Sequence, residues 1–458
     1  MSGFGRRILQ SGTRELTLVS NSAEPQELRA DLIGRDDLKE KIRSILMTKI
    51  DPAVAGKMPR LQLRAEVALL VTAIATEEKV QLNELEENAL AAELIDDMIG
   101  LGPLEPLLQD DTVTDILVNG PFDVYVERRG KLEKTQARFR NAQHVVNIGQ
   151  RIATAVGRRI DESSPLVDAR LADGSRVNIV FPPLCVNGGT ISIRKFSRQN
   201  IVLETMVQQG NLSAAMAHFL DIAARCRINI LISGGTGSGK TTLLNAVSRH
   251  IDGGERIITI EDAIELRLQQ PHIVQLESRP PNIEGVGQIA QRELVRNALR
   301  MRPDHIIVGE VRGTEAFDML QAMNTGHDGS MSTIHANSPR DALSRLENMV
   351  LMAAANLPLR ALRAQISSAI NLIVQIERMR DGIRRIAKIV EIGDMEGEII
   401  STRDIFKFEY KGERDGVLQG TFEPSRLRPD LAAKAAQYGL ERQLLSSVGI
   451  STGLITVS

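Results

Sequence analysis

Residues 228–242 read INILISGGTGSGKTT. The apolar start of this stretch predicts a buried strand, and the glycine-rich part fits the pattern G-x-x-x-x-G-K-[ST]. Its glycines let successive backbone N–H groups bind phosphate oxygens at a helix N-terminus. We therefore expect a nucleoside-triphosphate site that is formed by Gly235, Thr236, Gly237, Ser238, Gly239, Lys240, Thr241 and Thr242.

Two side chains of this loop have separate expected roles. Lys240 should reach the β- and γ-phosphates, and the hydroxyl of Thr241 should occupy one position around Mg²⁺. The alternative is a glycine-rich turn that binds no ligand. The context favours ATP and Mg²⁺, because a strand precedes the loop and good helix formers follow it at 243–249.

Short apolar runs alternate with helical stretches in the same part of the chain. They predict a parallel sheet that helices cover on both faces, with strands at 228–233, 256–261, 305–310 and 330–336. Two later runs, 372–377 and 385–392, should extend this sheet or complete it with antiparallel strands. Beyond residue 408, only a helix near 430–438 is predicted.

The length of 458 residues predicts about three domains. Before the apolar runs, the sequence predicts a small bundle of helices, with one apolar stripe at Leu61, Ala65, Ala68 and Leu69. A compact α+β unit should follow, with a hairpin around Gly130, a helix at 142–157, and strands at 176–181 and 190–196. We expect a flexible arm, a helical domain, an α+β lid domain and an ATPase domain with a C-terminal extension, at residues 1–30, 31–99, 100–212 and 213–458.

Acidic residues stand at the ends of two predicted strands. Glu261 and Asp262 follow one strand and Glu310 ends another. Ligands of open α/β sheets bind at this edge, where a carboxylate can orient the attacking water or hold Mg²⁺ through its water shell. Each acid could instead cap a helix. Acids after two separate strands favour hydrolysis over simple binding, with either Glu261 or Glu310 as the base.

Two histidines lie in the segment GHDGSMSTIHAN at 326–337. The spacing of His327 and His335 does not fit a metal pair on a helix, and the chain has only two cysteines, so zinc is not expected. We interpret both as candidate catalytic residues that sense the γ-phosphate. The alternative is a structural histidine in a glycine-rich turn.

The composition of the chain disfavours some classes of nucleic-acid-binding protein. The net charge is −2, aromatic residues make up 3%, and there is no tryptophan. Both features disfavour proteins that bind single-stranded nucleic acid by stacking bases on aromatic rings. No apolar stretch approaches the roughly 18–20 residues of a membrane-spanning helix, so we expect a cytoplasmic protein without direct nucleic-acid contacts.

Four segments in order resemble the Walker A, Asp box, Walker B and His box of the secretion-ATPase superfamily, which includes type II secretion, type IV secretion and type IV pilus motors. They are GGTGSGKTT, TIEDAIEL, RPDHIIVGEVRG and GHDGSMSTIHAN. The segments that resemble Flp/Tad pilus assembly ATPases of the CpaF/TadA type are TDILVNGPFDVYVERRGKL, RLADGSRVNIVFPP, AQISSAINLIVQIERMRDGIRRI and FEPSRLRP. This resemblance covers residues 100–429.

The resemblance implies an α/β fold with a RecA-like core, in a ring of six identical subunits with ATP between a hinged N-terminal domain and the core. It implies that N-terminal arginines reach the phosphates, with Arg176 and Arg194 at matching positions and Arg170 as a weaker candidate. Glu261 matches the general base, and Glu310 matches the Walker B acid. Such motors act on an inner-membrane platform protein, so the chain should be peripheral on that membrane through partners.

The resemblance also includes one departure. Many members carry a four-cysteine zinc module after the Walker B segment, which this chain lacks. The departure favours the Tad and conjugation-type branches. A type IV secretion ATPase for DNA or effector transfer is the main alternative, ahead of a RecA-like nucleic-acid translocase and a P-loop kinase.

Overall fold

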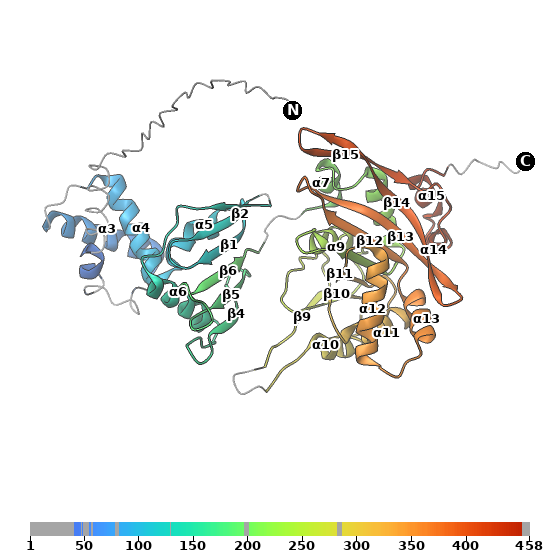
Figure 1. Ribbon diagram of the computed structural model, residues 1–458, viewed down its shortest axis with the longest axis horizontal. Helices are drawn as coiled ribbons and strands as arrows, with labels where there is room; N and C mark the ends of the chain where they lie inside the picture. The colour runs from blue at the N-terminus through green and yellow to red at the C-terminus, as the bar shows by residue number, and fades with distance from the viewer. Residues whose placement is uncertain are drawn as a thin grey trace, which may run out of the picture.

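The computed structural model describes residues 41–46, 48, 55, 58–77, 82–128, 130–196, 201–281 and 286–450. The flexible arm predicted at residues 1–30 lies outside these ranges. Figure 1 shows helices near the N-terminus, then a smaller sheet, then a larger sheet with helices around it.

A nine-stranded sheet forms the larger part of the molecule. Its order is β15-β14-β13-β12-β7-β11-β10-β8-β9, and every pair from β12 to β9 is parallel. The predicted parallel sheet and the α/β fold class are therefore confirmed. The parallel strands are β7 (Ile230–Gly234), β8 (Ile257–Glu261), β9 (Ile273–Glu277), β10 (His305–Val311), β11 (Met331–His335) and β12 (Leu372–Arg378).

Helices cover both faces of this sheet because its central strands are apolar on both sides. Along β7, Ile230 and Ile232 belong to one core cluster, and Leu231 belongs to the other. The first cluster includes side chains of α8 (Ala214–Arg225) and α9 (Lys240–Ser248). The second includes side chains of α10 (Gln291–Ala298), α11 (Glu315–Asn324), α12 (Pro339–Ala353) and α13 (Leu359–Ala369).

The antiparallel end of the sheet is longer than the sequence predicts. After β13 (Arg384–Glu396), the chain continues as β14 (Ile399–Arg414) and β15 (Val417–Pro424), followed by α14 (Leu431–Gln437) and α15 (Glu441–Ser447). The helix predicted near 430–438 is confirmed as α14, whereas β15, α15 and the end of β14 were not predicted. Much of β14 and β15 is exposed and charged, so the apolar pattern that reveals a buried strand is missing. The short β9 strand at the opposite edge of the sheet was not predicted either; it has five residues, none of them fully buried.

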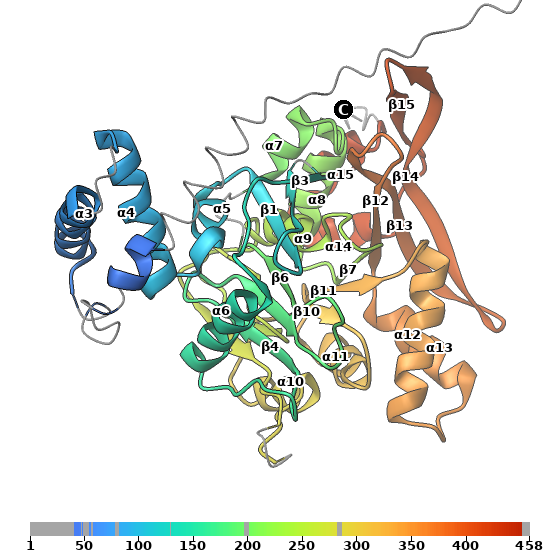
Figure 2. The same cartoon turned by 60° about the vertical axis from the view of Figure 1, so that its left-hand side comes forward.

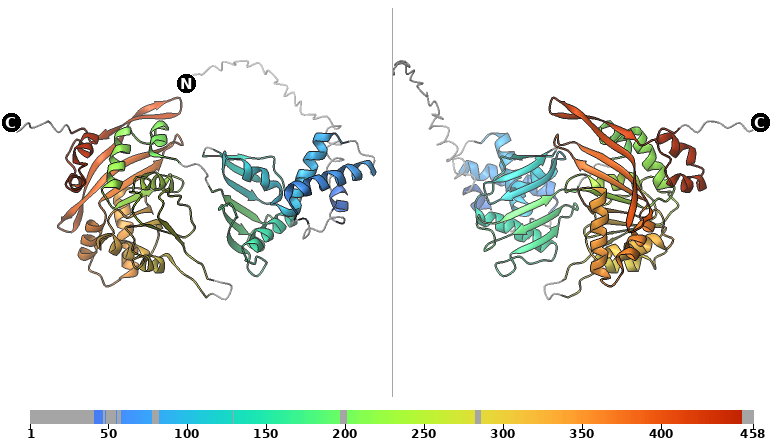
Figure 3. Two further views of the ribbon diagram at one scale, coloured as in Figure 1. Left: turned by 180° about the vertical axis from the view of Figure 1, so that it is seen from behind. Right: turned by 45° about the vertical axis from the view of Figure 1, so that its right-hand side comes forward.

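The smaller sheet has six strands in the order β3-β2-β1-β6-β5-β4, and all of its pairs are antiparallel. Helix α6 (Ala142–Ala155) packs against it through a buried apolar stripe, as its periodicity predicts. Figure 3 shows this sheet apart from the nine-stranded sheet as a separate layer, and in the view of Figure 2 it lies in front of that sheet. The strands are β1 (Val113–Asn119), β2 (Val124–Arg128), β3 (Lys131–Lys134), β4 (Leu166–Arg170), β5 (Arg176–Val180) and β6 (Thr190–Arg194).

Short helices connect these layers. A 3₁₀ turn at Gly102–Leu104 and α5 (Glu105–Gln109) lead into β1, and α7 (Leu203–Gln208) precedes α8. Before them, α3 (Arg60–Glu77) packs against α4 (Glu84–Ile99), so the helical character predicted for this part is confirmed.

The predicted apolar stripe on α3 is wrong. Leu61 and Leu69 are 86% and 72% exposed, and the buried side chains are instead Leu63, Val67, Val71 and Ile74. Apolar residues occur all around this helix, so periodicity alone could not choose the face that packs on α4. Among the residues that the structure describes, no helix combines the length and apolar character needed to cross a membrane.

Candidate active site

The loop between β7 and α9 has the backbone of a phosphate-binding loop. Gly237 and Gly239 have φ values of 69° and 98°, in a region that glycine adopts without a steric penalty. Helix α9 begins at Lys240, whose Nζ donates to the carbonyls of Gly234 and Gly235 at 3.1 and 3.0 Å. The loop therefore curves back so that its first residues contact Lys240, and an incoming anion would meet the N-terminus of α9.

The environment of Lys240 is consistent with an anion partner. Burial lowers the pKa of its ammonium group, and the nearby Glu310 carboxylate partly opposes this shift. A phosphate would favour the charged form of the lysine by direct attraction. Thr241 and Thr242 lie half-buried in the first turn of the same helix.

Three further predicted residues reach the same edge because their strands run parallel to β7. Glu261 is the last residue of β8, Glu310 lies near the end of β10, and His335 is the last residue of β11. In the sheet register, His335 stands directly beside Gly234 at the start of the loop. The structure therefore brings Lys240, both glutamates and His335 to one sheet edge.

Glu261 is a buried carboxyl, and only one of its two oxygen atoms accepts hydrogen bonds. Its Oε2 accepts from the backbone N–H groups of Glu265 and Leu266 at 2.8 and 3.0 Å, whereas Oε1 has no partner. Burial raises the pKa of Glu261 to about 7. A carboxyl with a pKa near neutrality and a free oxygen is suited to accept a proton from water.

Gly309 makes room for this carboxyl. A Cβ at that position would stand 2.8 Å from Cγ of Glu261. The glycine before Glu310 therefore determines where Glu261 can lie, which couples the ends of β8 and β10.

Glu310 has a different environment from Glu261. Its Oε2 accepts from the Arg312 guanidinium, with Nε at 3.0 Å, and Arg312 also approaches Asp262 at 3.8 Å. The two acids at this edge therefore differ. Glu261 is buried and has a pKa near neutrality, whereas Glu310 is paired with the guanidinium of Arg312.

His327 does not reach this edge. It precedes the first residue of β11, and its Nδ1 lies 3.3 Å from the carbonyl of Ala322 at the end of α11. Because β11 spans roughly 13 Å from its first to its last residue, His327 lies before the amino end of this strand and His335 at its carboxyl end, on opposite sides of the sheet along the strand direction. The expectation that both histidines act at the phosphates is therefore kept for His335 alone. Spacing along the chain could not show that a strand separates them.

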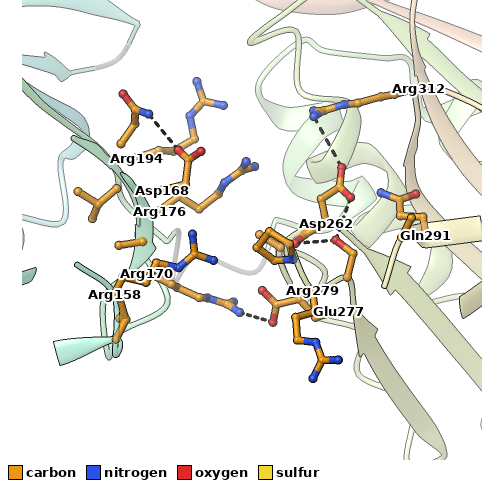
Figure 4. Close-up of a pocket in the computed structure, with 18 of the residues that line it drawn as sticks. Arg158, Asp168, Arg170, Arg176, Arg194, Asp262, Glu277, Arg279, Gln291 and Arg312 are labelled. Atoms are coloured by element: carbon orange, nitrogen blue, oxygen red, sulfur yellow. Dashed lines mark hydrogen bonds and ion pairs between the residues drawn. The ribbon is translucent and has the colours of Figure 1, made fainter. Parts of the chain in front are cut away.

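The six-stranded sheet faces this region with a row of arginines. Arg170 pairs with Arg176 in the strand register, and Arg176 pairs with Arg194, so the three lie side by side on one face. Like charges directly opposite one another destabilise a sheet. Their side chains line a cleft of about 1010 Å³ between the two sheets, which Figure 4 shows from the side.

Two arginines of the row cross the cleft to acids near Glu261. Arg176 Nη1 bonds Glu265 Oε1 at 2.9 Å, and Arg170 Nη1 bonds Glu277 Oε2 at 3.0 Å. Arg170 Nη2 also donates to the carbonyl of Ile264 at 2.6 Å. The dashed line from Arg170 in Figure 4 marks its ion pair with Glu277. The weaker sequence candidate, Arg170, therefore makes the most contacts across the cleft.

Arg194 lines the same cleft but bonds within its own sheet, to Asp115 at 3.2 Å. Sequence reasoning missed the partners of these arginines, Glu265 and Glu277, and it missed Arg312. Only Arg312 had a local signal, because it stands two residues after Glu310, just beyond the end of β10, and residues two apart in an extended chain lie on the same side.

The oxygen groups at the sheet edge suit a hard divalent cation. The hydroxyl of Thr241 and the carboxylate of Glu310 are ligand types that Mg²⁺ prefers, together with phosphate oxygens. Within the described part of the chain, no group of three or more His, Cys, Asp and Glu side chains forms a metal cluster by itself. The residues therefore fit a cation that shares its coordination with a nucleotide.

Comparisons with known proteins agree on one family. A family model described as "Type II/IV secretion system protein" matches residues 97–398. A putative conjugal transfer protein of Mycobacterium tuberculosis is 40% identical over 309 residues, 66% of this chain and 87% of the relative. The type IV secretion system protein PtlH of Bordetella pertussis is 36% identical over 324 residues, 65% of this chain and 94% of the relative.

Solved structures include the VirB11 ATPase of the Brucella suis type IV secretion system, crystallised with sulphate. It is 31% identical, and the alignment covers 63% of this chain and 94% of that chain with a TM-score of 0.34.

Proposed function

We propose that this chain, which belongs to the type II/IV secretion system protein family, is a motor ATPase that powers assembly of a Tad-type pilus. Family membership confirms the predicted superfamily and the prediction that the chain is an ATPase. The pilus role, the hexameric ring and the individual residue roles are our proposal.

One observation carries the proposal. The ends of four neighbouring parallel strands hold the phosphate-binding loop, Glu261, Glu310 and His335 at one edge. An arginine row on a second sheet lines a cleft whose other side includes Asp262, the residue after Glu261. A binding protein needs only the loop. Two acids in contrasting environments and a set of cations on a separate layer are features that hydrolysis and domain closure require.

In the first step, the N–H groups of residues 235–242 and the ammonium group of Lys240 bind the phosphates of ATP. The hydroxyl of Thr241 and the carboxylate of Glu310 would hold Mg²⁺, which neutralises charge on the β- and γ-phosphates when bound. Closure of the cleft then moves Arg176 and Arg194 toward the γ-phosphate, where a guanidinium can bind two oxygens at once.

In the second step, the free oxygen of Glu261 accepts a proton from the attacking water, and Glu310 orients that water. We assign the proton to Glu261 because its raised pKa lets it release the proton again near neutral pH. His335 donates a hydrogen bond to the γ-phosphate and loses it after hydrolysis. Departure of phosphate then reopens the cleft and moves the neighbouring subunit of a homo-hexamer.

The Tad assignment rests on the segments at 114–132, 170–183, 364–386 and 422–429, which resemble Tad pilus ATPases. In this role the motor is cytoplasmic and acts on the inner membrane through a platform protein. A second candidate is a type IV secretion ATPase for DNA or effector transfer. It is favoured by the names of two relatives, the putative conjugal transfer protein and the type IV secretion system protein PtlH.

Deletion of the gene in its native cell separates these two roles. The proposal expects loss of surface pili with unchanged transfer of DNA and effectors, and restoration by the wild-type gene. If the deletion abolished transfer of DNA or effectors and left the pili normal, the chain would be a type IV secretion ATPase and the Tad assignment would be wrong.

The enzymatic part is tested with the purified chain. We expect hydrolysis of Mg-ATP, a ring in electron micrographs that closes with a non-hydrolysable analogue, and no stimulation by single-stranded DNA. Lys240→Ala should abolish nucleotide binding, because residues 235–242 then lose their one ammonium group. Nucleotide binding by Lys240→Ala at wild-type affinity would contradict the assignment of the loop.

A further inference from the structure

The turn between β12 and β13 lies beside the phosphate-binding loop. Strand β12 pairs directly with β7, which leads into that loop. Arg384, at the start of β13, donates from Nε to the carbonyl of Gly237 at 3.0 Å. Nη1 of Arg378, the last residue of β12, lies 3.9 Å from the position that a Cβ on Gly237 would take. Two guanidinium groups of the nine-stranded sheet, those of Arg378 and Arg384, therefore lie beside the phosphate-binding loop.

Arg378 also contacts the six-stranded sheet. Its Nη2 donates to the carbonyl of Gly130, in the turn between β2 and β3, and its Nη1 lies 4.0 Å from Oε1 of Glu127. Gly130 has a φ of +77°, and a Cβ there would collide with the guanidinium of Arg378. This turn is therefore shaped to receive the arginine.

We propose that Arg378 is a positioning residue that couples nucleotide binding to the release of the β2–β3 turn. Without nucleotide, Arg378 holds the turn against the nine-stranded sheet. When phosphates enter the loop, they compete for the same guanidinium and the turn is released. This inference rests on the proposed function only in requiring that the loop binds a nucleotide.

The competition favours phosphate for electrostatic reasons. The present partners of Arg378 are a neutral carbonyl and a carboxylate at 4.0 Å, and the side chain is 32% exposed. Partly exposed pairs of this kind contribute little stability, whereas phosphate oxygens form charge-assisted, two-pronged bonds with guanidinium. By linkage, the contact with the turn must weaken nucleotide binding by the factor by which nucleotide weakens the contact.

The same turn offers a matched control. Arg380 lies two residues after Arg378 and bonds the hydroxyl of Tyr410 at 3.0 Å and Glu413 at 2.7 Å, on β14. It is also an arginine on the β12–β13 turn, but its partners belong to the antiparallel end of the sheet.

Hydrogen exchange of the full-length chain tests the coupling. We would measure amide exchange over residues 124–134 without nucleotide and with saturating Mg-ADP or a non-hydrolysable ATP analogue. In wild type, exchange should rise severalfold when nucleotide is added. Arg378→Ala should exchange fast in both conditions, Arg378→Lys should lie between, and Arg380→Ala should match wild type. The proposal would be overturned if nucleotide did not change the amide exchange rate in wild type, or if Arg378→Ala exchanged slowly.

Nucleotide affinity gives a second readout that a purely structural role would not move. Glu127→Gln leaves the loop untouched and removes one competitor for Arg378. It should tighten nucleotide binding by about threefold, with kcat unchanged. Unchanged or weaker binding would contradict the competition.

Failure of the proposed function would look different. A wild-type chain that binds no nucleotide would refute that function, and Arg378→Ala without nucleotide would still decide whether the arginine holds the turn.

Discussion

The two sheets on either side of the cleft, which we call its two walls, hold their functional groups in different ways. On the nine-stranded sheet, Lys240, Glu261 and His335 stand at the ends of strands or the start of a helix, where backbone hydrogen bonds determine their positions. On the six-stranded sheet, Arg170, Arg176 and Arg194 reach out as long side chains from one row. The first wall is preorganised for binding and chemistry, and the second depends on how far the layers close.

The burial of the groups follows the same division. Glu261 is 3% exposed, whereas the side chains of Arg176 and Arg194 are 44% and 60% exposed. Changes on the first wall should therefore alter the chemistry itself. Changes on the second wall should alter the step that closure controls.

The largest effect is expected for Glu310→Gln. The amide keeps the shape of the side chain but cannot pair with Arg312 as an anion or hold the cation with full charge. We expect kcat to fall by about 10³-fold with nucleotide affinity retained. Glu409→Gln, an exposed glutamate of β14, is the control. Turnover near the wild-type rate in Glu310→Gln would make the Walker B assignment wrong.

Removal of Arg176 tests the second wall. Arg176→Ala should lower kcat by about 10²-fold, because a guanidinium next to the γ-phosphate stabilises the charge of the transition state. The effect on affinity should be small, since Arg176 now bonds Glu265 instead of the loop. Arg158→Ala, which lines the same cleft outside the row, should remain near wild type. An equal loss in both variants would contradict a specific role for the row.

The pH dependence of turnover tests Glu261. Burial raises its pKa to about 7, so the carboxylate that accepts the proton forms as the pH rises through that value. We expect kcat/KM to increase by about tenfold per pH unit between pH 5 and 7 and then to level off. Glu261→Gln should remove this dependence together with most of the activity. A flat profile in the wild type would place the base elsewhere.

Stability should show the same titration. A carboxyl whose pKa is raised in the folded state gives stability that is complete below its unfolded pKa and is lost as the pH rises through about 7. At pH 9, Glu261→Gln should therefore be more stable than wild type by about 2–3 kcal/mol, and near pH 4 the difference should vanish. Urea unfolding at the two pH values measures this, and an equal difference at both would contradict it.

The smallest effect concerns the contact between the walls. Glu265→Gln removes the present partner of Arg176 and leaves the arginine free to reach the phosphates. We expect nucleotide to bind about two- to fivefold more tightly, and the stability to change by less than about 1 kcal/mol, because both side chains are partly exposed. Binding isotherms with a fluorescent nucleotide measure the change, and weaker binding would show that the pair supports the closed form.

Most of the arrangement on the first wall could be predicted from the amino-acid sequence. The pattern G-x-x-x-x-G-K-[ST] after an apolar strand is typical of a phosphate-binding loop, and parallel strands place their carboxyl ends at one edge. Lys240, Glu261, Glu310 and His335 could therefore be predicted to meet. Apolar residues on both sides of each strand made that half of the sheet visible in the pattern.

The remaining features depend on how the elements pack in three dimensions. The tertiary structure placed Arg170, Arg176 and Arg194 in one row, because antiparallel register depends on turns and packing that no local pattern encodes. It moved His327 to the opposite edge and turned Leu61 and Leu69 of α3 toward solvent. It also brought Arg378 to Gly130, 248 residues away in sequence, because two separately folded sheets meet there. Contacts between layers follow from the way whole elements pack, and short stretches of sequence do not specify that packing.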